Sequence, residues 1–121
     1  MMPATVSRRV LVIDDDMNTA ETLALLLKQM GHEVRFAVNG VAAMQIANGF
    51  SPDVVFVDLA MPEMDGYEVA LKIRALRLNA VRIFAITGMQ GDEHRQRCIA
   101  AGFNSFLVKP IDPELLRRLS A

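Results

Sequence analysis

Four short apolar runs in this 121-residue sequence are followed at once by polar side chains whose types could do chemistry. The polar residues are Asp14, Asp15 and Asp16 after the run at 10–13, Asp58 after the run at 54–57, Thr87 after the run at 81–86, and Lys109 after the run at 105–108. If the runs are parallel strands, all of these side chains lie at one edge of a sheet. Carboxylates crowded at such an edge repel one another, and a divalent cation is the least costly way to keep them ionised.

The ligands offered at this edge are oxygen atoms, which favour a hard cation. We expect Mg²⁺, with Mn²⁺ as the alternative, because Mg²⁺ accepts few protein ligands and keeps waters that a phosphoryl oxygen can replace. The Lys109 ammonium and the Thr87 hydroxyl can reach the same space. Together, the carboxylates, the cation, the lysine and the hydroxyl are the groups that phosphoryl transfer requires. Asp58 is the nucleophile by elimination, because it stands alone on its strand whereas Asp14 and Asp15 are suited to hold the cation.

Five apolar runs of strand length must position these residues. They lie at 10–13, 33–37, 54–57, 81–86 and 105–108. The segments between and after them carry helical spacing and helix punctuation. Helices are predicted from a cap at Asn18 and Glu21 to Gly31, from Val41 to Asn48, from a cap at Asp65 and Glu68 to Leu76, within DEHRQRCIAAG (92–102), and from Pro113, capped by Asp112, to Leu119.

This alternation of strand and helix indicates an α/β fold in which helices cover both faces of a parallel sheet. The first, third and fourth runs are almost continuously apolar, as buried inner strands are, whereas EVRFA (33–37) alternates as an edge strand can. We therefore predict a doubly wound five-stranded parallel sheet of order 2-1-3-4-5, a flavodoxin-like three-layer sandwich. Ligands of such sheets bind outside the carboxyl ends of the strands.

Composition bounds the class of protein. Apolar residues make up 52% and charged residues 22% of the chain, which is typical of one globular domain, and no stretch approaches the ~20 apolar residues of a membrane span. The net charge of −1 gives no general attraction to nucleic acid or to membrane surfaces. The single Cys98 cannot form an internal disulfide, and we infer the cytoplasm. Residues 1–8 are expected to be a loose tail and residues 9–121 the folded unit.

The motifs VLVIDDD, VVFVDLAMPEMDG, AITG and LVKPID, in this order, resemble the receiver domains of two-component response regulators from Arg9 to about Leu119. The stretches AITGMQG, AGF and LVKPID look most like receivers fused to hybrid sensor histidine kinases. The resemblance implies a signalling domain, not an enzyme, that takes a phosphoryl group onto Asp58 from a histidine kinase or a histidine phosphotransfer protein. By the same resemblance, Asp15, Asp58 and the backbone carbonyl of Ala60 ligate Mg²⁺ directly, and Asp14 contributes through water.

The resemblance also implies a conformational switch. Thr87 and Lys109 contact the phosphoryl oxygens, the Lys109–Pro110 bond is cis, and Phe106 turns inward after phosphorylation. The switch face comprises the fourth helix, the fifth strand and the fifth helix, and it serves an output partner that the sequence does not name. Because Ala60 and Met89 lack polar groups that could orient an attacking water, we expect slow self-dephosphorylation.

Two other functions compete with this interpretation. In a haloacid-dehalogenase-type phosphatase, Asp14-x-Asp16 would carry the nucleophile, but Asn18 stands where that motif expects Thr or Val, and such enzymes are usually longer. That reading also leaves Asp58, Thr87 and Lys109 unexplained as a set. A degenerate receiver that only binds a partner is disfavoured because every motif position is filled.

Structural roles explain the remaining polar residues better than chemistry does. Asp16 and Asp65 are interpreted as helix caps. His32 and His94 lack metal-ligand spacing and are interpreted as surface residues. Cys98 is interpreted as a small buried filler.

Overall fold

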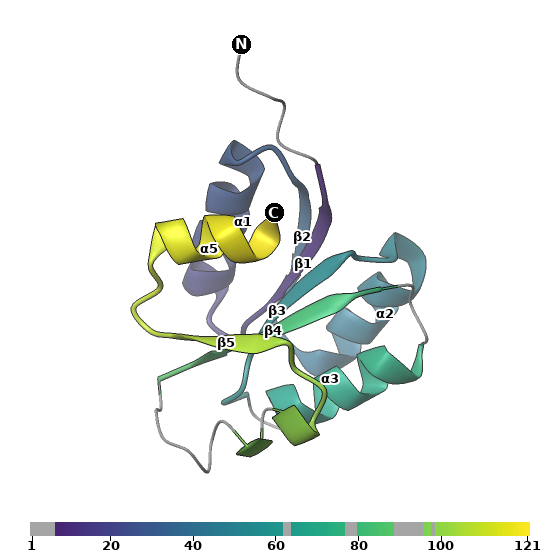
Figure 1. Cartoon of the computed structure of the whole chain (residues 1–121). Coiled ribbons are helices and arrows are strands. Elements are labelled where there is room, and N and C mark those ends of the chain that lie inside the picture. The colour runs from purple at the N-terminus through teal and green to yellow at the C-terminus, as the bar shows by residue number, and fades with distance from the viewer. Residues whose placement is uncertain (1–6, 62–63, 77–79, 89–95, 98) are drawn as a thin grey trace.

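The computed structural model of the chain describes residues 7–61, 64–76, 80–88, 96–97 and 99–121 (Figure 1). Its strands are β1 (Arg9–Ile13), β2 (Glu33–Ala37), β3 (Val54–Asp58), β4 (Arg82–Thr87) and β5 (Ser105–Val108). Its helices are α1 (Met17–Gln29), α2 (Gly40–Phe50), α3 (Gly66–Ala75) and α5 (Pro113–Ser120). The five predicted strands are confirmed to within one residue at each end.

The strands form one parallel sheet in the order β2-β1-β3-β4-β5, which confirms the predicted topology. β2 lies at an edge, and the continuously apolar β1, β3 and β4 lie inside. The register pairs Ile13 with Val57 and Asp58 with Ile86. As a result, the carboxyl ends of the three inner strands lie next to one another.

Two apolar layers fill the space between the sheet and the helices. Alternate strand residues point to opposite faces. Leu11 and Ile13 therefore belong to the apolar layer with α2 and α3, and Val10 and Val12 belong to the layer with α1 and α5. These two pairs of helices lie on opposite sides of the sheet (Figure 1). All five residues of β3 are buried. The inner strands are therefore held from both faces, which gives the residues at their ends a rigid support.

Side-chain caps begin the helices. Asp65 and Asp112 cap α3 and α5 as predicted, and their carboxylates accept from the backbone N–H groups of Glu68 and Glu114. The cap predicted at Asn18 is wrong. α1 is instead capped by Asp16, which accepts from the Asn18 N–H, so the interpretation of Asp16 as a cap is confirmed.

The interpretation of His32 as a surface residue is also wrong, because this side chain is only 7% exposed. Most of the predicted fourth helix, with His94, Cys98 and Met89, and residues 1–6 of the predicted tail lie outside the described residues. The described residues of that segment, Gln96, Arg97, Ile99 and Ala100, are helical. Among the described residues, no helix has the length and apolar content needed to span a membrane.

Candidate functional site

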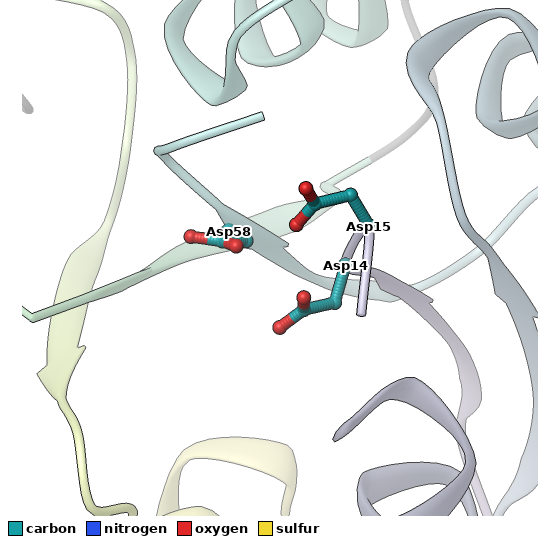
Figure 2. Close-up of side chains that lie close together, drawn as sticks. All are labelled: Asp14, Asp15 and Asp58. Atoms are coloured by element: carbon teal, nitrogen blue, oxygen red, sulfur yellow. The ribbon is translucent and has the colours of Figure 1, made fainter. Parts of the chain in front are cut away.

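Three carboxylates meet at the carboxyl edge of the sheet. Asp14 and Asp15 follow β1 and Asp58 ends β3, and one oxygen of each lies within 4.8 Å of the oxygens of the other two. Figure 2 shows Asp15 and Asp58 converging from neighbouring strands, with Asp14 below them. The juxtaposition predicted from the strand ends is therefore present.

Asp58 stands on a fixed backbone. Its side chain is buried, and its Oδ1 accepts from the Ala60 N–H at 3.1 Å. The next amide, Leu59 N–H, donates to the Ile86 carbonyl of β4 at 3.0 Å, so the strand pairing continues past the acid. The carboxylate is thereby held by both the chain before it and the chain after it.

Asp14 is fully buried, and only one of its two carboxylate oxygens accepts a hydrogen bond from the described residues. Its Oδ1 accepts from the Asp16 N–H at 3.0 Å, whereas its Oδ2 has no hydrogen-bond partner among the described residues. Burial raises the pKa of Asp14 above its usual value, and the nearby charge of Asp58 raises it further. A buried acceptor without a hydrogen bond, beside two more carboxylates, fits a divalent cation with oxygen ligands.

Lys109 supplies the positive charge in this cluster. Its Nζ lies 3.6 Å from Asp14 Oδ2 and 3.7 Å from Asp58 Oδ2, and its side chain is 38% exposed. Thr87 ends β4 and is buried, and its carbonyl accepts from the Lys109 N–H at 2.8 Å. The Lys109–Pro110 peptide bond is cis, as the resemblance implied. The structure thus brings together Asp14, Asp15, Asp58, Thr87 and Lys109.

The two remaining predicted residues lie close to this cluster along the chain. Ala60 is exposed, two residues beyond Asp58, and its N–H holds the Asp58 carboxylate. Phe106 is paired with Ala85 in the sheet, and it is partly buried against the apolar layer beneath α2 and α3. Met89, which was predicted to flank the acceptor, lies outside the described residues.

The sequence did not predict the close approach of α3 to β3, the strand that ends at Asp58. The Gly66 N–H donates to the Leu59 carbonyl at 3.2 Å. A Cβ at Gly66 would lie 2.8 Å from the Leu59 Cα and would also clash with the backbone oxygen of Asp58. The only available signal was a glycine directly after a capping aspartate, which is compatible with many helix starts.

The site thus places a lysine beside three carboxylates at the carboxyl edge of a doubly wound parallel sheet. The family model described as the response regulator receiver domain matches residues 10–120 of this chain. The chain belongs to this family, and it is a receiver domain of two-component phosphorelay signalling. The resemblance to receiver domains that the sequence motifs indicated is therefore confirmed.

Known proteins differ in how much of their length this chain spans. A Leptolyngbya boryana protein described as an uncharacterized 14.6 kDa protein is 37% identical over 110 residues, which cover 89% of this chain and 84% of that protein. The sensor histidine kinase RcsC of Salmonella typhimurium is 33% identical over 93% of this chain, which spans only 12% of that kinase. The chemotaxis protein CheY4 of Vibrio cholerae matches with a TM-score of 0.87 and 29% identity, over 94% of this chain and 99% of that one.

Proposed function

We propose that Asp58 accepts a phosphoryl group from the phosphohistidine of a histidine kinase or a histidine phosphotransfer protein. The observation that carries this proposal is the position of the Lys109 ammonium, which lies between Asp14 and Asp58 while the Asp15 carboxylate completes the cluster. Mg²⁺, or Mn²⁺ in its place, would be held by Asp14, Asp15, Asp58 and the Ala60 carbonyl. The receiver unit is proposed to span residues 9–121.

In the proposed reaction, an Asp58 oxygen forms a bond to phosphorus as the bond from phosphorus to the donor's imidazole nitrogen breaks. The electron pair of the broken bond stays on the imidazole, which leaves neutral after taking a proton. The bound cation would neutralise charge on the transferring phosphoryl oxygens. Lys109 adds a second positive charge there, and the buried backbone of β3 holds the attacking oxygen in line. The domain would promote its own modification and turn over no separate substrate.

The proposed product carries a dianionic group where a single carboxylate stood. Thr87 ends the neighbouring strand, so its hydroxyl would move towards this group and draw its loop along. Phe106 would follow into the space vacated. The face formed by the segment before β5, β5 itself and α5 would then change shape for an output partner, and the cytoplasm is the proposed location. Neither direct contact with nucleic acid nor membrane insertion is part of the proposal.

The test is single-equivalent labelling by acetyl phosphate, followed by intact mass with Mg²⁺ present. We expect the native chain to gain one phosphoryl group and Asp58→Asn to gain none. Asp112→Asn serves as the matched control, because it changes an exposed capping aspartate to another good cap and should label normally.

Labelling of Asp58→Asn would refute the proposal. If labelling survived at Asp58→Asn, disappeared in Asp14→Asn and was accompanied by turnover of phosphate esters, the phosphatase reading would replace it. An unlabelled native chain that binds no Mg²⁺ would favour the binding-module reading.

A further inference from the structure

The segment before β5 is described at residues 96–97 and 99–104. Its Arg97 side chain packs on the first turn of α3. Its guanidinium carbon lies 3.9 Å from the centroid of the Tyr67 ring, and its Nη2 lies 3.9 Å from Asp65 Oδ2. The Arg97 side chain is 64% exposed, so the long ion pair contributes little and the stacking on the ring is the main attachment.

The first turn of α3 is itself fixed to the phosphoacceptor strand. The Gly66 N–H bonds to the Leu59 carbonyl, and there is no space between this turn and the backbone of Asp58 for even a methyl group. Tyr67 is buried and its ring meets Phe103 edge-on at 6.1 Å. Arg97 therefore stacks on a turn that is in direct contact with the backbone of Asp58 and Leu59.

The other end of the same segment is held much more firmly. Arg74, on the last turn of α3, donates from Nε and Nη2 to the Gly102 carbonyl at 3.2 and 2.8 Å, and from Nη2 to Asn104 Oδ1 at 2.7 Å. Asn104 Oδ1 also accepts from the Ile83 N–H of β4 at 2.7 Å. Two partly buried hydrogen bonds from Arg74 thus hold Gly102, whereas the Arg97 side chain is held, among the described residues, by exposed stacking on Tyr67 and a long ion pair with Asp65. Of these two described attachments to α3, the one at Arg97 is therefore the weaker.

We propose that the Arg97–Tyr67 contact is the release point of the switch, which holds the segment before β5 in its resting position and parts when Asp58 is phosphorylated. This inference rests on the proposed function, because it concerns the regulation of the same site. A contact made only in the resting state lowers the apparent affinity for anything that binds the switched state. Loss of an exposed stacking contact should therefore tighten such binding by roughly two- to fivefold.

Tyr67 makes the release directly observable. The chain has one tyrosine and no tryptophan, so its intrinsic fluorescence reports on the ring that Arg97 covers. The probe is beryllium trifluoride with Mg²⁺, which occupies a carboxylate as a phosphoryl group would. In the native chain, Tyr67 fluorescence should change on titration with the probe. In Arg97→Ala, the change should be largely absent, because the cation has already left the ring.

The affinity for beryllium trifluoride, measured by calorimetry, tests the proposal. Arg97→Ala should bind roughly two- to fivefold more tightly than the native chain, and Arg97→Lys should fall between them. Asp65→Asn, which keeps the α3 cap, should bind nearly as the native chain does. The matched control is Arg35→Ala, which removes an arginine stacked 4.7 Å above the Phe50 ring, away from the site, and should bind unchanged.

A purely structural role for Arg97 would lower stability without tightening the binding. Equal or weaker binding by Arg97→Ala, while the native chain binds the probe, would therefore overturn the release point and leave the proposed function intact. If neither the native chain nor Arg97→Ala bound the probe, the proposed function would fail as well.

Discussion

Asp14 is a carboxylate whose ionised form is costly to bury in the folded protein but would be needed to bind a cation. Its carboxylate is buried, one of its oxygens has no hydrogen bond among the described residues, and it faces Asp58 across the strand ends. Both burial and repulsion disfavour its ionised form, as the raised pKa reflects. A bound cation, as proposed, would relieve this charge arrangement.

Replacing Asp14 by Asn should stabilise the metal-free protein, because an amide carries no charge and can donate to Asp58. We expect a gain of about 1 kcal/mol in the free energy of unfolding by urea. We expect millimolar Mg²⁺ to stabilise the native chain and to stabilise this variant much less. Asp16→Asn is the control, since it keeps the cap and lies outside the carboxylate cluster. A destabilised Asp14→Asn protein would contradict this account.

For single residues, the sequence located the candidate site residues better than it predicted which polar residues are buried. The site residues were found because each follows an apolar run directly, and a strand end fixes where its next side chain lies. His32 was misplaced because its neighbours Gly31 and Glu33 are polar or small, and only tertiary packing buries it. The sequence offered both Asp16 and Asn18 as caps for the first helix, because three successive aspartates leave its first turn ambiguous, and the structure has Asp16 in that position.

Helix α3 is in direct backbone contact with the strand that carries Asp58. Its first turn lies directly against the end of β3, with Gly66 at the contact. Because the neighbouring atoms belong to the backbone of Asp58 and Leu59, they cannot give way as a flexible side chain could. The start of α3 therefore helps to set the position of Asp58.

Gly66→Ala should lower the free energy of unfolding by about 2 kcal/mol or more, because the added methyl group forces α3 away from β3. Gly49→Ala is the matched control. No atom lies within 4 Å of a Cβ built at Gly49, which is in α2, so this substitution should stabilise the protein by about 0.5 kcal/mol. Urea unfolding of both variants measures the two effects. If both substitutions shifted the midpoint in the same direction, the close approach at Gly66 would not be the cause.

The elements themselves were largely predictable from the sequence. Continuous apolar runs such as VVFV and aspartates before helical stripes gave the strands and two of the caps, since both signals act over a few residues. The contact of Gly66 with β3 and the stacking of Arg97 on Tyr67 join residues of different elements. No local pattern encodes such contacts, so they could be read only from the structure.

At the opposite end of the molecule from the site, His32 links the amino ends of β1 and β2. Its Nδ1 accepts from the Arg8 N–H at 3.1 Å, and the Arg8 carbonyl accepts from the Glu33 N–H at 3.0 Å. These bonds join the residue before β1 to the start of β2. Burial first, and then the nearby Arg8 charge, lower the pKa of His32 below its usual 6.5. Protonation of Nδ1 would also remove the acceptor of the Arg8 bond.

Because the folded state holds fewer protons on His32 than the unfolded state does, this contribution to stability is complete above about pH 6.5 and is lost as the pH falls towards the folded-state pKa. Each unit of pKa difference corresponds to about 1.4 kcal/mol. Urea unfolding from pH 8 to pH 5 should show this loss, and His32→Gln should show less of it. Parallel pH profiles for the two proteins would rule out His32 as the cause.

If Asp58 is the nucleophile, as proposed, the buried and hydrogen-bonded backbone around it decides which reactant must move. Its strand is buried throughout, and the amide after it remains bonded to the neighbouring strand, so the attacking oxygen cannot advance on a distant donor. The whole approach, down to contact between oxygen and phosphorus, falls to the incoming molecule. Donors of equal chemical reactivity should consequently differ in rate according to how well each docks and aims its phosphorus atom.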